Sequence, residues 1–227
     1  IPAESSVAGK RGFRWRRPRH ALTGRQDRDA VDRIGLRLRL RKAQAAAGDI
    51  TLLFGDEAEA LTHPYLAQAW ARRGADLRIQ APGQAKKVAL MGALDAVTRE
   101  VSVHTACTKR SADFVALLET IERRYGPEAS GPIRPVVLVL DNGPVHTSKL
   151  TTKAFAARPW LTVEWLPKYA PELNEIERAW RDLKRHYLAH RTFADAKDLE
   201  ATIHHAVITM NRERTQTPSC DSLRSAA

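Results

Sequence analysis

The chain has 227 residues, of which 43% are hydrophobic and 28% are charged, a balance typical of a folded globular domain. No apolar run approaches the roughly 18 residues that a membrane-spanning helix needs, and no basic leader with an apolar stretch and a cleavage site is visible. These features exclude a membrane protein and predict a cytoplasmic one. Two cysteines, Cys107 and Cys220, lie far apart without CxxC spacing, which excludes a cysteine-based zinc site.

Positive charge is concentrated near the N-terminal end. The formal net charge is +11, and the first 42 residues contain 13 Lys and Arg against four acidic residues, or 13 − 4 = +9. A basic arm on a nearly neutral body is typical of proteins that bind nucleic-acid phosphates, although a solvated tail has the same composition. The candidate DNA contacts in this arm are Arg14, Trp15, Arg16, Arg17 and Arg19.

The hydrophobic pattern predicts strands and helices that alternate along the chain. The first part should contain a helix over 26–47 that ends at Gly48, a strand over 50–55, a short helix over 66–73 that ends at Gly74, strands over 87–96 and 101–105, and a helix from a capping Ser111 to Tyr125. The second part should contain a strand over 135–140, a helix over 148–157, a strand over 161–166, and helices over 173–188 and 194–212.

This order indicates an α/β fold in which helices flank a mixed sheet. The central strands are continuous apolar runs rather than alternating ones, which predicts that helices cover both faces of the sheet. We divide the chain into a basic arm and helix over 1–48, a main α/β domain over 49–212 and a polar tail over 213–227.

Three acidic residues stand where a metal site could form. Asp56 and Asp141 each follow a buried strand, and charged side chains at strand ends in such a sheet point into the crevice where ligands bind. Glu177 lies on the helix predicted over 173–188. Each acid alone has an ordinary explanation, as a turn former, a helix cap or an ion-paired surface residue. Together they offer the oxygen ligands that Mg²⁺ prefers, and two such ions can stabilise an in-line phosphoryl displacement.

The sequence around these acids resembles a known family. The stretch LVLDNGPVHTSK, followed by LPKYAPELNEIERAWRDLK, is similar to the signature of mariner-related bacterial insertion-sequence transposases, members of the DDE endonuclease superfamily. Their pattern is an apolar strand ending in Asp-Asn, a nearby His, and then Leu-Pro-x-Tyr-Ser-Pro-x-Leu-Asn-Pro-Ile-Glu-x-x-Trp. On this resemblance Asp56, Asp141 and Glu177 match the three catalytic, metal-binding acids, and the similarity covers residues 12–212.

The resemblance implies a ribonuclease-H-like catalytic domain that binds two Mg²⁺ or Mn²⁺ ions and cuts DNA with a metal-activated water. The freed 3′ hydroxyl then attacks target DNA, usually at TA dinucleotides, so the implied partners are transposon ends and target DNA. A homodimer in the active complex and a bacterial, nucleoid-associated location are also implied.

Further residues near the acids are candidates for supporting roles. Asn142 and Asn174 would bind the carboxylates, Glu57 would lie beside them, and His146 would touch a phosphate, orient a water or play a structural role at a helix start. Candidate phosphate contacts, each of which could equally belong to a solvated face, are Lys168, Arg181 and Lys184. We expect Trp165 and Trp180 to be core residues.

The sequence departs from the family pattern at four positions. Ala170 replaces the usual Ser, Glu175 replaces the usual Pro, and Ala58 and Glu59 stand where Ser and Gly are common. None of these changes removes a predicted ligand, although Glu175 adds a second acid near Glu177. Family members usually carry helix-turn-helix modules before this domain, so we expect the chain to be a fragment, a split-frame product or a truncated copy.

Two other functions fit the same sequence. One is a catalytically idle, DNA-binding remnant of a transposase, in which the basic arm carries the binding. The other is a host nuclease of the same fold that does not transpose. Metal-dependent nicking would separate an active enzyme from the idle remnant, and joining of a cut end to target DNA would separate a transposase from a host nuclease.

Overall fold

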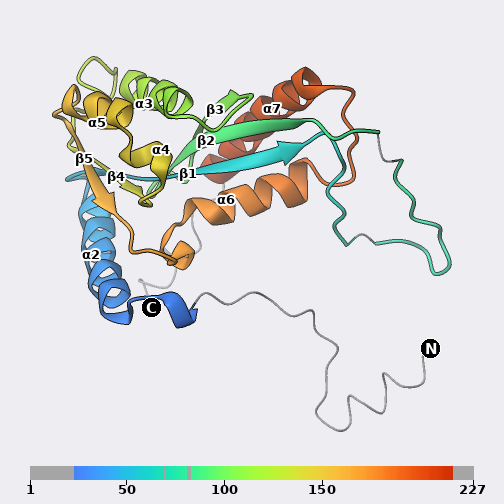
Figure 1. Cartoon of the computed structure of the whole chain (residues 1–227), viewed down its shortest axis with the longest axis horizontal. Helices are drawn as coiled ribbons and strands as arrows, with labels where there is room; N and C mark the ends of the chain where they lie inside the picture. The colour runs from blue at the N-terminus through green and yellow to red at the C-terminus, as the bar shows by residue number, and fades with distance from the viewer. Residues whose placement is uncertain (1–22, 69, 81–82, 217–227) are drawn as a thin grey trace, which may run out of the picture.

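A five-stranded mixed sheet forms the centre of the computed structural model, which describes residues 23–68, 70–80 and 83–216 (Figure 1). The antiparallel part joins β1 (Thr51–Leu61) to β2 (Lys87–Asp95) and β2 to β3 (Val101–Ala106). In the parallel part, β1 pairs with β4 (Val136–Leu140) and β4 with β5 (Leu161–Trp165). The strand order is therefore β3-β2-β1-β4-β5, and the predicted mixed sheet is confirmed.

Helices cover both faces of this sheet, as the continuous apolar strands predict. One face packs against α3 (Ser111–Tyr125), α4 (Pro144–Thr147) and α5 (Lys149–Ala156). The other packs against α2 (Arg28–Ala47), α6 (Ile176–Asp182) and α7 (Ala196–Gln216). Alternate residues of β1 and β4 belong to two separate apolar clusters, one on each face, because successive side chains of a strand point in opposite directions. No helix in the described part of the chain is long and apolar enough to cross a membrane.

Helix α2 belongs to the folded body. The side chain of Asp27 caps its first turn by accepting a hydrogen bond from the Ala30 amide (3.0 Å), and Gly48 ends it at φ 85°, a conformation that favours glycine. Leu38 and Ala45 are buried against the sheet. The arm residues at positions 14–19 that were selected as DNA contacts lie outside the described residues.

Three local predictions were wrong. The first strand does not end before Asp56 but continues to Leu61, because β2 pairs with it over the whole stretch from Leu53 to Leu61. The helix expected over 66–73 is absent from the described residues there, and Leu66 and Trp70 are largely exposed, so neither side chain would hold a helix against the body. Ser111 is the first residue of α3 rather than its cap, which is Arg110.

The helix predicted over 173–188 is interrupted. Residues Pro171–Leu173 form a 3-10 turn (η2), α6 begins only at Ile176, and a π-helical turn (η3, Leu183–Tyr187) follows it. The break at Asn174 arises because its side-chain amide donates to the Gly55 carbonyl (3.0 Å), which ties this segment to β1. The last helix, α7, runs to Gln216, four residues beyond its expected end at 212 and into the stretch assigned to a polar tail.

Candidate active site

The register of β1 and β4 brings Asp56 and Asp141 to the same edge of the sheet. The last parallel pair is Phe54 with Val139, and each aspartate lies two residues beyond its strand's member of that pair. Asp141 therefore follows the end of β4 as predicted, whereas Asp56 lies in the middle of β1, where it pairs with Gly92 of β2. The two aspartates line the same edge because the parallel pairing of β1 with β4, rather than the end of β1, sets their positions along the strands.

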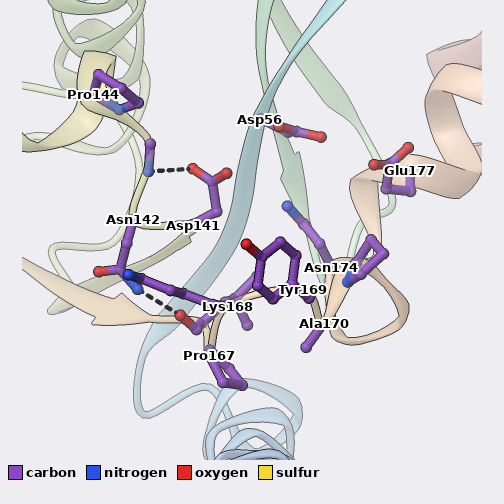
Figure 2. Close-up of a pocket in the computed structure, with 13 residues that line it drawn as sticks. Asp56, Asp141, Asn142, Pro144, Pro167, Lys168, Tyr169, Ala170, Asn174 and Glu177 are labelled. Carbon is purple, nitrogen blue, oxygen red and sulfur yellow. Dashed lines mark hydrogen bonds between the residues drawn. The ribbon is translucent and has the colours of Figure 1, made fainter. Parts of the chain in front are cut away.

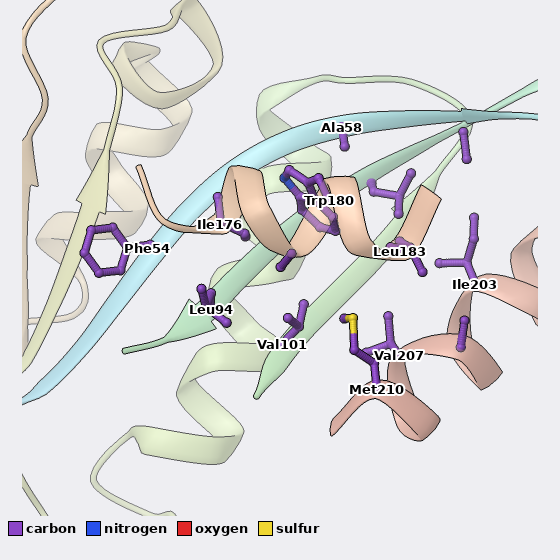
Figure 3. Packing of buried hydrophobic residues seen from close by; sticks show 14 of the residues in the cluster. Phe54, Ala58, Leu94, Val101, Ile176, Trp180, Leu183, Ile203, Val207 and Met210 are labelled. Atoms are coloured by element: carbon purple, nitrogen blue, oxygen red, sulfur yellow. The ribbon is translucent and has the colours of Figure 1, made fainter. Parts of the chain in front are cut away.

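Glu177 reaches the same edge from α6. That helix lies across β1 and β2 with its Ile176 and Trp180 side chains buried (Figure 3). Its Glu177 is exposed. Trp180 fits against the sheet because residue 92 is glycine: a Cβ there would lie 2.3 Å from the indole ring. Since Gly92 pairs directly with Asp56, the packing of Trp180 on Gly92 fixes where α6 presents Glu177 relative to Asp56. As predicted, Trp180 is a core residue.

The three acids line one open cavity of about 580 Å³. Figure 2 shows Asp56, Asp141 and Glu177 arriving from three separate segments and facing this space. Asn142, Lys168 and Asn174 also line the cavity, as does Tyr169. Sequence reasoning did not select Tyr169, although its position in the Lys-Tyr-Ala-Pro motif is the signal that could have found it.

The acids repel one another. Burial, and after it the negative charges of Glu177, Glu57 and Asp141, together raise the pKa of Asp56 to about 7. The pKa of Asp141 is instead lowered, chiefly by a hydrogen bond from His146 and also by the Gly143 amide. A half-buried carboxylate among other carboxylates is a site where a cation would relieve repulsion, and all three donors are the hard oxygens that Mg²⁺ and Mn²⁺ take. The residues present therefore fit a divalent metal site.

His146 is buried beside Asp141. Its side chain is fully buried, with Nδ1 2.7 Å from Asp141 Oδ1 and Nε2 3.3 Å from Glu57 Oε1. Burial by itself would lower the pKa of His146, but the bond to Asp141 and the charge of Glu57 outweigh it and raise the pKa. The His146 side chain therefore offers no exposed surface in this structure, and Glu57 lies close to it and to Asp141.

The two asparagines bind backbone rather than carboxylates. The side-chain amide of Asn142 donates to the Leu166 carbonyl (2.7 Å), and that of Asn174 donates to the Gly55 carbonyl. Both residues line the cavity, but in this structure their amides bind these carbonyls rather than the carboxylates that we expected. The Asn142 bond joins the segment after β4 to the segment after β5. The Asn174 bond joins the segment before α6 to β1.

Glu175 is directed away from the other acids. Its carboxylate pairs with Lys42 of α2 and with Arg99 in the turn between β2 and β3, and these cations lower its pKa despite its partial burial. Among the residues that line the cavity Glu175 is absent. The acid that stands at the usual proline position is therefore part of an ion-pair network that joins three segments of the fold.

Basic side chains border the acids on two sides. Lys168 lines the cavity, while Arg181 and Lys184 line an adjoining groove that shares Glu177 with it. Burial lowers the pKa of Lys184, and the charge of Glu177 partly opposes this effect. Positive charge therefore lies in both cavities that Glu177 borders.

With the fold and the acids described, comparison with known proteins gives the family. Residues 51–200 match the family described as DDE superfamily endonuclease. The chain belongs to this family. That range contains all five strands and all three acids of the cavity, so the part of the chain that matches is the part that builds the site.

Individual relatives of this DDE endonuclease domain agree with the family. It is 28% identical over 172 residues to an uncharacterised 39 kDa protein of insertion element IS630 from Shigella sonnei, a match that covers 76% of this chain and 48% of that protein. The chain thus spans about half the length of the curated relative.

Solved structures share the fold. A Mos1 transposase paired-end complex with the left transposon end has a TM-score of 0.59 at 18% identity, covering 93% of this chain and 68% of that one. A mariner Mos1 paired-end complex with Mg has a TM-score of 0.58 at the same identity, covering 94% and 68%. The ribonuclease-H-like fold, a mixed five-stranded sheet between two helical layers, is therefore established.

Proposed function

We propose that this chain is the catalytic domain of a transposase that cleaves DNA and joins the cut end to target DNA. The observation that carries the proposal is the cavity lined by Asp56, Asp141 and Glu177 in a DDE endonuclease domain. The similarity to the IS630 protein and to the fold of Mos1 transposase supports transposition rather than another nuclease function. Transposon ends and target DNA are then the substrates, and the active species is a homodimer.

We assign the metal-ligand role to Asp56, Asp141 and Glu177. When bound there, two Mg²⁺ or Mn²⁺ ions would activate the attacking water or 3′ hydroxyl and stabilise the leaving oxygen of an in-line displacement. The carboxylates come from two neighbouring strand segments and one helix, and the packing of α6 on the sheet holds Glu177 near Asp56. Because all three are oxygen donors in a largely open cavity, space remains for a phosphodiester beside them.

The chain's other residues would bind and orient the DNA strand. Lys168 on one side of the acids, and Arg181 and Lys184 on the other, are placed to contact phosphates that flank the scissile one. Hydrolysis would leave a 3′ hydroxyl on the cleaved strand, and the same site would then hold that hydroxyl for attack on a target phosphate. No protein nucleophile is needed, because water or the 3′ hydroxyl attacks phosphorus directly.

Metal-dependent nicking tests the assignment of the acids. The purified chain with supercoiled plasmid and Mn²⁺ or Mg²⁺ should nick DNA weakly, and chelator should abolish the reaction. Asp141→Asn and Glu177→Gln should each lower the nicking rate at least about 100-fold, because each removes a charged ligand, while DNA affinity in a gel-shift assay stays near that of the wild type. The matched control is Glu175→Gln, two residues from Glu177 and outside the cavity, which should keep most of the activity.

Two results would contradict the proposal. Loss of nicking in Glu175→Gln but not in Glu177→Gln would show that the third ligand is wrong. Absence of metal-dependent cleavage, in an assay where a longer relative cleaves, would favour an idle DNA-binding domain. Cleavage without joining of a pre-cut end to target DNA would instead indicate a nuclease that does not transpose.

A further inference from the structure

His146 is a buried histidine that contacts two acids, Glu57 on β1 and Asp141 just after β4. Its ring packs edge-on against Phe114 of α3, with 4.6 Å between ring centroids, and its side chain has no exposed surface. Nδ1 lies 2.7 Å from Asp141 Oδ1, and Nε2, which has no hydrogen-bond partner within the described chain, faces Glu57 Oε1 at 3.3 Å. Burying a polar imidazole ring is unfavourable unless its nitrogens interact with polar groups. Here each nitrogen faces one carboxylate, so the ring connects the two acids.

The link lies where the sheet stops holding β1 and β4 together. Backbone pairing between these strands ends at Phe54 and Val139, two residues before Asp56 and Asp141. Beyond that point, backbone hydrogen bonds of the ladder no longer fix the separation of the two aspartates. Glu57 is the neighbour of Asp56 on β1 and points to the opposite face, towards α3 and α4, because side chains alternate along a strand. The contact between His146 and Glu57 therefore links β1 to the segment after β4 beyond the last backbone pair.

His146 also determines which oxygen of Asp141 faces the cavity. The Gly143 amide donates to Asp141 Oδ1 over 3.0 Å, and Nδ1 of His146 contacts the same oxygen. With Oδ1 engaged twice, the carboxylate cannot rotate freely, and Oδ2 is the oxygen left to face Asp56. Outer partners of this kind orient metal-binding carboxylates and commonly alter metal affinity by about 10–100-fold when removed.

We propose that His146 is a positioning residue that clamps Asp141 to the Glu57 side of β1, and so sets the spacing and orientation of the Asp56–Asp141 pair. This inference rests on the proposed function, because it assigns a purpose to the clamp only if those two aspartates hold metal. His146 touches neither substrate nor metal in this role and acts through Asp141.

Three substitutions separate the two contacts of the ring. An Asn side chain carries its amide nitrogen close to the position of Nδ1, and a Gln side chain carries its amide nitrogen close to that of Nε2, whereas Leu fills the space without a donor. His146→Asn still donates to Asp141 but loses the contact with Glu57, so it should raise the half-saturating Mn²⁺ concentration for nicking about 3-fold. His146→Leu should raise that concentration about 10-fold or more, and His146→Gln should fall between them.

A second readout and a matched control separate positioning from folding. The rise in Tm that Mn²⁺ produces should follow the same order as the nicking, with each Tm in chelator as the baseline. Phe114→Leu perturbs the same packing, since Phe114 contacts the His146 ring, but it removes no hydrogen bond to an acid. It should lower Tm in chelator without changing the half-saturating Mn²⁺ concentration.

The outcomes distinguish this inference from the proposed function. If the wild type shows neither Mn²⁺-dependent nicking nor a Mn²⁺-dependent rise in Tm, the proposed function fails and the clamp has no purpose. If the wild type responds to Mn²⁺ and His146→Leu requires the same Mn²⁺ concentration, the clamp alone is wrong. A shift in Phe114→Leu as large as that in His146→Leu would likewise overturn it, since general packing would then explain the effect.

Discussion

At the scale of single residues, the alternation of side chains along β1 separates two acidic roles. Asp56 faces the cavity on the α6 side, while the next residue, Glu57, faces His146 on the opposite side. A strand can place neighbouring acids in different environments in this way, one half-buried among negative charges and one beside a histidine. The electrostatic consequence is concentrated on Asp56, whose pKa rises to about 7 from a reference of 3.8.

This raised pKa predicts a pH-dependent stability of the metal-free chain. The folded state binds the Asp56 proton more tightly than the unfolded state does, so ionisation destabilises the fold as pH rises from about 4 to about 7, and the loss stays constant above that range. Asp56→Asn cannot ionise. In chelator it should therefore raise the free energy of unfolding by about 1–3 kcal/mol at pH 8 and by much less at pH 4.

Denaturant unfolding at the two pH values measures the effect. Added Mn²⁺ should stabilise the wild type at pH 8 but should leave Asp56→Asn almost unaffected. An equal gain in stability at both pH values would show that the substitution acts through packing rather than through the ionisation of Asp56.

At the scale of elements, close packing of apolar side chains fixes the position of α6. Ile176 and Trp180 of α6, with Leu183 at the start of η3, belong to one apolar cluster with Leu94, Val101 and the α7 residues Val207 and Met210 (Figure 3). The Trp180 ring occupies the space that a Cβ at residue 92 would need. The active-site geometry thus depends on a glycine that contributes no functional group.

Gly92→Ala should separate Glu177 from Asp56. The added methyl group would overlap the Trp180 ring, so α6 must shift outward or the ring must leave its place, at a cost of about 1–3 kcal/mol in stability. We expect nicking measured well below Tm to fall by at least about 10-fold, because small displacements of catalytic groups are expensive. Gly131→Ala is the matched control, since a Cβ at residue 131 meets open space.

A second substitution makes the Gly92→Ala result specific to this contact. Trp180→Phe replaces the indole with a smaller ring, so it should restore part of the activity in the Gly92→Ala background. Additive losses in the double variant would argue that the two residues do not act through their contact.

At the scale of the whole molecule, the basic charge of the first 42 residues is divided between the body and the arm. Arg37 and Arg41 both pair with the buried Glu164 of β5, and Lys42 pairs with Glu175. These α2 residues dock the helix, so the full +9 is not available for DNA. Residues 1–22 contain six Lys and Arg and one Glu, a net charge of 6 − 1 = +5.

Removing residues 1–22 should weaken DNA binding and its dependence on salt. Each phosphate contact releases condensed counterions, so the slope of log affinity against log salt should become shallower by up to about 5. Fluorescence anisotropy with duplex DNA over a series of NaCl concentrations measures the slope, and an unchanged Tm confirms that the body remains folded. An unchanged slope would locate DNA binding in the body. A longer deletion through Lys42 would be uninformative, because it removes most of α2 and the buried Leu38.

The sequence by itself predicts the mixed α/β sheet, the positions of Asp56 and Asp141 in or next to β1 and β4, and the third acid on a helix. Uninterrupted apolar runs such as VVLVL identify buried strands through local composition, and the motif around Glu177 lies in contiguous residues. Such patterns can be recognised without knowing the fold, because a strand that is buried on both faces is apolar along its whole length.

Other features were decided only by contacts between distant segments. The extension of β1 to Leu61 depends on pairing with β2, the break at Asn174 depends on a bond to Gly55, and Glu175 is withdrawn from the acids by Lys42 and Arg99. The contact of His146 with Glu57 and the fit of Trp180 on Gly92 have the same origin. Hydrogen bonds, ion pairs and packing between segments far apart in the sequence have no local signature, so the sequence supplied the acids while the tertiary structure set their geometry.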